Sequence, residues 1–176
     1  VFKRALQLLS NPDFVDHASP FKWGINLSGM TISDDEFHDY VSGCLQEYAF
    51  LPTNLYFEIT ETAAIKNFKN CVTFMNEIHS MGVQFALDDF GSGLSSFGYL
   101  KRLPVSYLKI DGSFVRDMCE DKIDRAMVHA INEIGHTMGI KTIAEYVENS
   151  ETLARLRIIG VDYAQGYSIH KPEVIG

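Results

Sequence analysis

Two adjacent carboxylates, Asp88 and Asp89, end an apolar stretch that begins at Phe85 and is followed by a loop rich in glycine. Neighbouring carboxylates at the mouth of a buried strand repel each other and are costly to remove from water. A positive charge is therefore expected beside them, and a divalent metal ion is the simplest candidate. The alternative is a solvated turn, in which Asp is a common residue.

Other oxygen donors follow apolar stretches elsewhere in the chain. Carboxylate and amide oxygens suit Mg²⁺ or Mn²⁺, and no His or Cys joins the set as zinc would require. Two such ions about 3.5–4 Å apart can activate water and stabilise the leaving oxygen of an in-line displacement at phosphorus. Asp88 could bridge two ions while Asp89 binds the second. The candidate metal ligands are Asn26, Glu58, Asp88, Asp89 and Glu145.

Lys109 lies inside an apolar segment that ends at Asp111, where a surface role is not expected. A buried ammonium near the acidic residues could orient water or neutralise phosphoryl oxygens. The alternative for Lys109 is a structural salt bridge to Asp111 or Glu145. Glu61 and Glu148 each lie three residues beyond another candidate, and each could cap or clamp the loop that follows.

These residues are positioned by an alternation of predicted strands and helices. A capping box, Ser33 to Glu36, begins one of the helices. Apolar periodicity and turn residues predict strands over 21–28, 55–60, 83–88, 106–110, 141–144 and 161–167, and helices over 1–10, 34–49, 68–82, 95–102, 113–138 and 150–159.

Each of the six predicted strands carries a polar residue near its C-terminal end. In a (β/α) barrel this end of the strands builds the active site. An open doubly wound sheet would instead gather ligand groups at one switch point, usually with a glycine-rich loop after the first strand, which this sequence lacks. The pattern predicts an α/β fold of the TIM-like barrel type, with the residues Asn26, Glu58, Asp88 with Asp89, Lys109, Glu145 and Gln165 at one face.

Composition restricts the partners. The chain has 176 residues, which suits one domain but is short for a barrel enzyme, and its net charge is −8. That charge argues against DNA binding, which requires a basic face. The three cysteines fit no zinc or disulfide pattern and favour a reducing cytoplasm. No apolar run is long enough to span a membrane, although a membrane-anchored parent protein is compatible with this sequence.

Six short motifs occur in the order and spacing of a known family. They are Asn26 in Ile-Asn-Leu-Ser, Glu58 in Phe-Glu-Ile-Thr-Glu, Asp88 and Asp89 in Asp-Asp-Phe-Gly, Lys109 in Leu-Lys-Ile-Asp, Glu145 in Ala-Glu-Tyr-Val-Glu, and Gln165 in Gln-Gly-Tyr. Over nearly the whole chain they resemble the EAL domain, the bacterial phosphodiesterase module for cyclic di-GMP. The resemblance implies a TIM-like barrel with one antiparallel strand. It also implies hydrolysis of cyclic di-GMP to linear pGpG with one or two Mg²⁺ or Mn²⁺ ions.

The resemblance also implies roles for individual residues. Asn26, Glu58 and Asp88 would bind one metal ion, and Asp88, Asp89 and Glu145 would surround the second. Lys109 would contact the attacking water, and Gln165 the substrate. Glu148 would brace the loop over 90–99, which the family uses for metal-site order and dimerisation. A homodimer and fusion to sensory or GGDEF domains are therefore expected.

The chain departs from the family pattern in several places. The Glu-Ala-Leu signature is absent, and we expect its strand to lie upstream of Val1 in the parent protein. We expect domain 1–176 alone, without that strand, to have little or no activity unless a partner chain completes it. Tyr146 stands where Gly is common, and Gly112 where Arg is common.

Two other functions compete with hydrolysis. The first is a catalytically inactive cyclic di-GMP receptor, which Gln, Ala or Lys at the missing Glu position would favour. The second is an enolase-like lyase acting on a carboxylate, but the His and Lys general bases that such sites use are absent.

Overall fold

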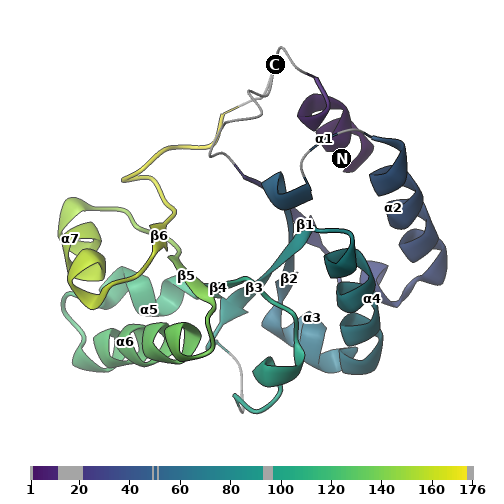
Figure 1. The fold of residues 1–176 in the computed structure, drawn as a ribbon. Coiled ribbons are helices and arrows are strands. Elements are labelled where there is room, and N and C mark those ends of the chain that lie inside the picture. Colours follow the sequence, from purple (N-terminus) through teal and green to yellow (C-terminus); the bar gives the residue numbers. More distant parts are fainter. Residues whose placement is uncertain (1, 12–21, 49, 51, 93–96, 174–176) are drawn as a thin grey trace. The chain divides into compact units, whose positions relative to one another are not determined.

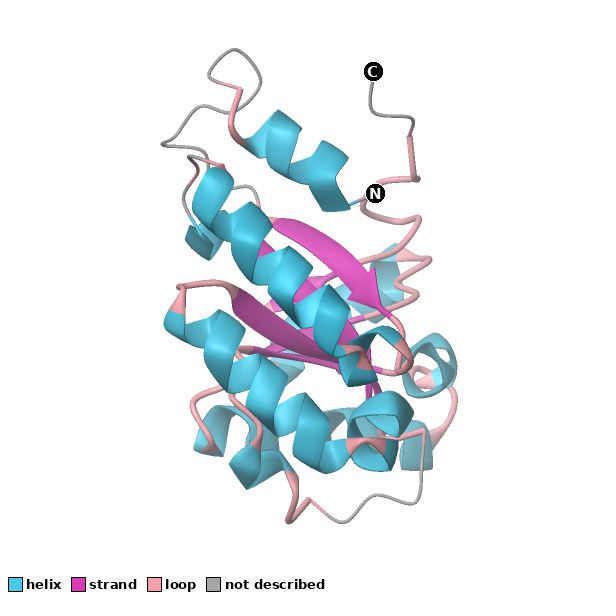
Figure 2. Ribbon diagram, turned by 90° about the vertical axis from the view of Figure 1, so that its right-hand side faces the viewer, coloured by secondary structure: helices cyan, strands magenta, loops and turns pink. Residues whose placement is uncertain are grey.

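The computed structural model of the protein describes residues 2–11, 22–48, 50, 52–92 and 97–173. Helices and strands alternate along the chain, as predicted (Figures 1 and 2). The helices are α1 Phe2–Leu9, α2 Asp35–Glu47, α3 Glu61–Lys66, α4 Phe68–Ser80, α5 Gly112–Asp117, α6 Lys122–Thr137 and α7 Ser150–Ile159. The strands are β1 Trp23–Leu27, β2 Leu55–Thr60, β3 Gln84–Phe90, β4 Tyr107–Ile110, β5 Lys141–Ala144 and β6 Tyr163–Ala164. Single 3₁₀ turns occupy Thr31–Ser33, Pro52–Asn54 and Leu100–Arg102.

The prediction of one long helix over 113–138 is wrong. Helix α5 ends at Asp117 and α6 begins at Lys122. The side chain of Asp121 accepts hydrogen bonds from the backbone N of Ile123 (2.6 Å) and of Asp124 (3.3 Å), so it caps the start of a new helix. The apolar periodicity continues across this break, which is why the sequence pattern did not reveal it.

Smaller corrections concern other ends of elements. Asp34, and not Ser33, is the N-cap of α2, because its carboxylate accepts from the backbone N of Glu36 and Phe37. The last strand is limited to Tyr163–Ala164, within the predicted 161–167. Of the predicted helix over 95–102, only the 3₁₀ turn Leu100–Arg102 is helical among the described residues, and positions 95 and 96 lie outside them. Helix α3, directly after β2, was not predicted.

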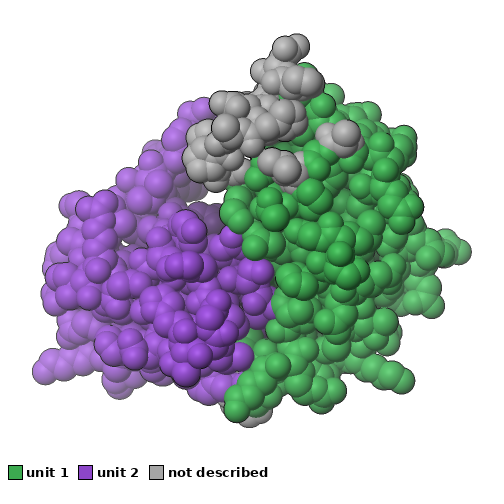
Figure 3. Space-filling model, in the orientation of Figure 1, with its two compact units in different colours: residues 1–86, 98–104 green, residues 87–97, 105–176 purple. Residues whose placement is uncertain are grey.

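The chain divides into two compact units, coloured separately in Figure 3. Unit 1 comprises residues 1–86 and 98–104, and unit 2 comprises residues 87–97 and 105–176. The strands are neighbours in the order in which they occur in the sequence, β1 to β6. Strand β3 begins in unit 1 and ends in unit 2, so its last residues belong with β4, β5 and β6.

Unit 1 contains the parallel pair β1–β2, in which Asn26 lies opposite Glu58. Its core is aromatic: the rings of Phe57, Phe74 and Phe85 lie with centroids 5.8–6.4 Å apart, and all three side chains are fully buried. Phe74 comes from the buried face of α4, which also carries Cys71, Met75 and Ile78.

Unit 2 contains the parallel pairs β4–β5 and β5–β6, with α6 packed on β4 and β5. Backbone hydrogen bonds continue past the strand ends, from Asp111 N to Phe90 O and from Glu145 N to Ile110 O. Gln165 N likewise donates to Ala144 O (2.8 Å). The C-terminal ends of these strands therefore lie at the same end of the sheet, as the predicted α/β fold with parallel strands requires. The three described pairings, β1–β2, β4–β5 and β5–β6, are all parallel.

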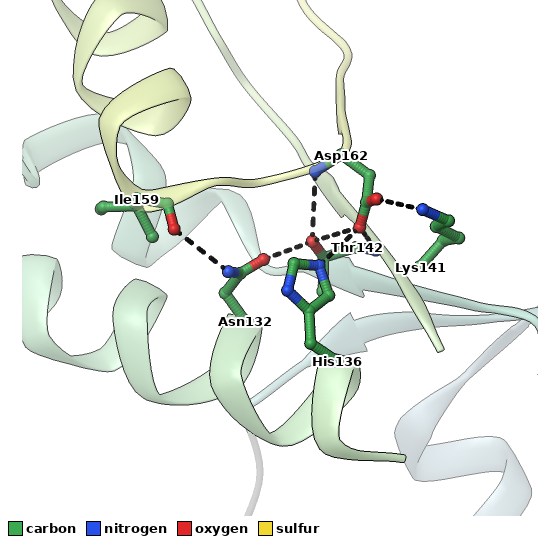
Figure 4. A network of polar contacts seen from close by, with 6 residues as sticks. All are labelled: Asn132, His136, Lys141, Thr142, Ile159 and Asp162. Atoms are coloured by element: carbon green, nitrogen blue, oxygen red, sulfur yellow. Dashed lines mark hydrogen bonds and ion pairs between the residues drawn. The ribbon is translucent and has the colours of Figure 1, made fainter. Parts of the chain in front are cut away.

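A polar network fastens the opposite, N-terminal end of β5 (Figure 4). The carboxylate of Asp162 lies 2.6 Å from Lys141 Nζ and 2.8 Å from His136 Nε2, and accepts from the backbone N of Thr142 (2.9 Å). The hydroxyl of Thr142 donates to Asn132 Oδ1 (2.6 Å), and Asn132 in turn donates to the carbonyl of Ile159. The network joins α6, β5 and the end of α7, and thereby supports the strand that Glu145 directly follows.

Within the described part of the chain, no helix combines the length and the apolar character needed to cross a lipid bilayer.

Candidate active site

The core of the candidate site is a buried ammonium held between two carboxylates. Lys109 Nζ lies 2.8 Å from Asp88 Oδ1 and 2.9 Å from Glu145 Oε1, and Lys109 is only 3% exposed. The three residues belong to β3, to β4 and to the position directly after β5, so three neighbouring strands bring them together. Of the two salt bridges expected for Lys109, the one to Glu145 is present. Asp111 has a different role: its carboxylate caps α5 by accepting a hydrogen bond from Ser113 N (2.7 Å).

Asp89 has an unusual backbone conformation near the end of β3, beside this cluster. Its φ is 54°, in the left-handed region that non-glycine residues seldom adopt, and its backbone N donates to Asp88 Oδ1 (3.1 Å). This bend brings the second carboxylate to the same side as the first. Oxygens of Asp88, Asp89 and Glu145 all lie within 4.8 Å of one another.

Three carboxylates this close repel one another, and both burial and this repulsion raise the pKa values of Glu145 and Asp89. Burial raises the pKa of Glu145 to about 7; the ammonium of Lys109 opposes this shift, while the charges of Asp88 and Asp89 add to it. Desolvation, followed by the charges of Asp88 and Asp111, raises the pKa of Asp89. A divalent cation would relieve this repulsion and restore the ionised forms. The three oxygens thus fit a hard divalent ion such as Mg²⁺ or Mn²⁺.

Asn26 and Glu58 form a second group, in unit 1. They lie opposite each other in the register of β1 and β2, near the C-terminal end of both strands. Asn26 is exposed and Glu58 is buried. A side chain at Gly24 would collide with Glu58 Oε1, so glycine at this position leaves space for the Glu58 carboxylate. Both residues are candidate metal ligands by chemistry.

Gln165 and Glu148 lie together in unit 2. Both line a pocket of about 320 Å³ that also reaches Glu145. Glu148 is exposed, so its side chain is free to face a ligand in this pocket as well as a neighbouring loop. Its expected contact with the loop over 90–99 stays a prediction, since residues 93–96 lie outside the described part of the chain.

Glu61 has a more definite role than the sequence revealed. It is 2% exposed and accepts a short hydrogen bond from the hydroxyl of Tyr99 (2.5 Å), a residue 38 positions away. The ring of Tyr99 packs edge-on against Phe68, on which Arg102 also stacks (4.7 Å). Glu61 therefore anchors the segment that follows the glycine-rich loop. The sequence showed only a Glu at a helix start, and no local pattern points to Tyr99.

Comparison with known proteins points to one family. The profile of the EAL domain matches residues 1–172. The cyclic di-GMP phosphodiesterase PdeB of Shewanella oneidensis is 44% identical over 149 residues, which cover 85% of this chain and 17% of that protein. The cyclic di-GMP phosphodiesterase PdeA of Borreliella burgdorferi is 37% identical over 175 residues, which cover 99% of this chain and 26% of that protein.

A solved structure of a related protein has the same fold. The PaMucR phosphodiesterase in complex with c-di-GMP superposes with a TM-score of 0.89 at 32% identity, covering 97% of this chain and 68% of that one. The likeness confirms the predicted TIM-like α/β fold class. The chain spans only 17% and 26% of the length of the two relatives named above.

Proposed function

Because the chain belongs to the EAL domain family, we propose that it hydrolyses cyclic di-GMP to linear pGpG with the help of a divalent metal ion. The observation that carries the proposal is the buried ammonium of Lys109, held between Asp88 and Glu145 with the Asp89 carboxylate beside them. This arrangement offers oxygens to a metal ion and a fixed positive charge to a phosphodiester at the same place.

The proposed ligands are the oxygens of Asp88, Asp89 and Glu145, with Asn26 and Glu58 as further ligands. The bound Mg²⁺ or Mn²⁺, one ion or two, would supply Lewis-acid activation of water and of the phosphoryl oxygens. Gln165, at the edge of the pocket beside Glu145, is proposed to contact the substrate. Glu148 is proposed to support the loop after Asp89.

The proposed reaction breaks one P–O3′ bond of the cyclic dinucleotide. Water attacks phosphorus, the 3′ oxygen leaves, and the 5′-phosphate of pGpG remains. Lys109 is proposed to orient the attacking water and to offset the charge that develops on the phosphoryl oxygens. The proton lost by the attacking water is balanced by the proton that the leaving 3′ oxygen takes up, and Glu145, 2.9 Å from Lys109 Nζ, is proposed to hold that ammonium in place.

The test is direct. The chain, expressed in its natural polypeptide, is incubated with cyclic di-GMP and Mn²⁺ or Mg²⁺, and the products are followed by chromatography. We expect pGpG to form only with metal, and to disappear in the Lys109→Ala variant. A folded, metal-loaded protein that produces no pGpG would refute the proposal. Binding of cyclic di-GMP without turnover would instead establish the receptor alternative.

We infer further properties of the wider protein that rest on family membership alone. These properties are assembly into a homodimer, fusion to sensory or GGDEF domains, and a location in the cytoplasm. Analytical ultracentrifugation of the protein checks the first, with twice the monomer mass as the expected result.

A further inference from the structure

The pocket beside Glu145 has two aromatic walls. Tyr146 and Tyr167 are 54% and 62% exposed, respectively, which is high for large aromatic side chains. The volume of about 320 Å³ lies at the lower end of the range for small-molecule sites. The lining consists of Glu145, Tyr146, Glu148, Gln165, Gly166 and Tyr167.

Tyr146, which lines this pocket, has an unfavourable backbone conformation. Its φ is 53°, in the left-handed region where a Cβ atom crowds the following carbonyl and where glycine is at ease. An aromatic residue there is held by its surroundings, and such strained residues cluster at functional sites.

Gly112 is one of those surroundings. A Cβ atom at position 112 would lie 2.7 Å from Cγ and 3.0 Å from Cβ of Tyr146, and closer still to Cδ2. On the same helix, the guanidinium of Arg116 lies 5.2 Å from the centroid of the Tyr146 ring. The two departures from the family pattern are therefore in direct contact: a ring at 146 needs the absence of a side chain at 112.

Backbone hydrogen bonds join the two segments that carry the pocket residues. Val147 N donates to Gln165 O (3.0 Å), and Ser168 N donates to Val147 O (2.9 Å). Gly166, with φ 153°, packs so closely on Val147 that a Cβ atom would meet its backbone carbonyl at 2.5–2.9 Å. The two tyrosines therefore extend from a fixed base.

We propose that Tyr146, positioned by Gly112 and Arg116, stacks on a purine base of the cyclic dinucleotide and sets the affinity of this chain for its substrate. The proposal rests on the proposed function. Aromatic rings beside nucleic-acid sites bind bases through their faces, and a neighbouring Arg strengthens the arrangement. Glu145 both lines this pocket and pairs with Lys109, so a base held here stays next to the proposed site of hydrolysis. The other reading is that the ring merely covers Gly112.

The experiment is a steady-state comparison with cyclic di-GMP and Mn²⁺, using the protein in its natural polypeptide. Tyr146→Gly is expected to raise KM about 5- to 100-fold, the range for loss of one stacked base, with kcat within about threefold of the wild type. Because glycine accepts the backbone conformation, this variant is expected to unfold at no lower urea concentration than the wild type. Tyr146→Phe, which keeps the ring, is expected to restore a low KM.

A second variant tests whether the Tyr146 ring needs the space left by the missing side chain at Gly112. Gly112→Ala leaves Tyr146 in the sequence but displaces its ring, so KM is expected to rise as in Tyr146→Gly, and the two changes together should add little. Ile158→Ala removes another exposed apolar side chain of unit 2 and serves as the control, with KM unchanged. An unchanged KM in Tyr146→Gly, while the wild type turns over, overturns this inference and leaves the proposed function standing. A folded, metal-loaded wild type that forms no pGpG overturns the proposed function, and the effect on KM inferred here falls with it.

Discussion

Replacing Lys109 by methionine removes the positive charge that lies between Asp88 and Glu145 and leaves an unbranched side chain only one atom shorter. Both carboxylates are buried, and the ammonium lies 2.8 and 2.9 Å from them. Breaking a buried ion pair from one side costs about 3–5 kcal/mol, because the remaining charge is left uncompensated. The carboxylates can limit that cost only by taking up a proton.

The pH dependence of this cost follows from Glu145. Burial raises its pKa to about 7, and Lys109 opposes the rise, so the variant should have a still higher value. A carboxyl group whose pKa is higher in the folded than in the unfolded protein destabilises the fold increasingly as pH rises toward the folded-state value. Without metal, we expect Lys109→Met to lose about 3 kcal/mol of unfolding free energy at pH 8 and about 1 kcal/mol at pH 5.5.

The assay is urea unfolding followed by circular dichroism in EDTA at both pH values, together with turnover of cyclic di-GMP in Mn²⁺. Turnover is expected to fall more than about 100-fold, because the variant lacks the charge that we propose faces the phosphoryl oxygens. Lys141→Met is the matched control: Lys141 is 59% exposed at the start of β5, and exposed ion pairs such as the one it forms with Asp162 contribute little to stability. If Lys109→Met turns over like this control, or loses the same stability at both pH values, the reasoning is refuted.

Three further changes test other parts of the molecule. Burial alone would raise the pKa of Asp162, but hydrogen bonds from Lys141, Thr142 and His136 lower it to about 2. The stability that the ionised Asp162 supplies is therefore present above pH 4 and is lost as the pH falls toward 2. Asp162→Asn should cost about 1–2 kcal/mol in urea unfolding at pH 6 and almost nothing at pH 2, and an equal cost at both would contradict the network. Asp88→Asn should weaken Mn²⁺ binding at least about tenfold by calorimetry; an unchanged affinity would remove Asp88 from the ligand set. Tyr99→Phe should cost about 1–2 kcal/mol in thermal unfolding because the buried Glu61 loses a donor, whereas the exposed Tyr163→Phe should cost little, and equal effects would argue against the anchoring role.

Much of the fold and of the candidate site could be predicted because both depend on local patterns. Apolar stretches of strand length each end in a polar residue, and parallel strands place such ends at one edge. Asp88, Lys109 and Glu145 were therefore expected to lie together, and the structure confirms that they do. The break between α5 and α6 escaped prediction because the apolar spacing continues through it and only the capping bonds of Asp121 reveal it.

The sequence by itself determined which residues could bind a metal ion, their order along the strands and the family to which the motifs point. Only the tertiary structure decided how these groups affect one another. The near-neutral pKa of Glu145 is a sum of burial and of charges on two neighbouring strands, β3 and β4, and the bond from Tyr99 to Glu61 joins residues 38 positions apart. The fit of Tyr146 over Gly112 depends on the space between the segment that follows β5 and the first residue of α5. Charge interactions and steric clearance depend on distances in space, and a one-dimensional pattern does not contain them.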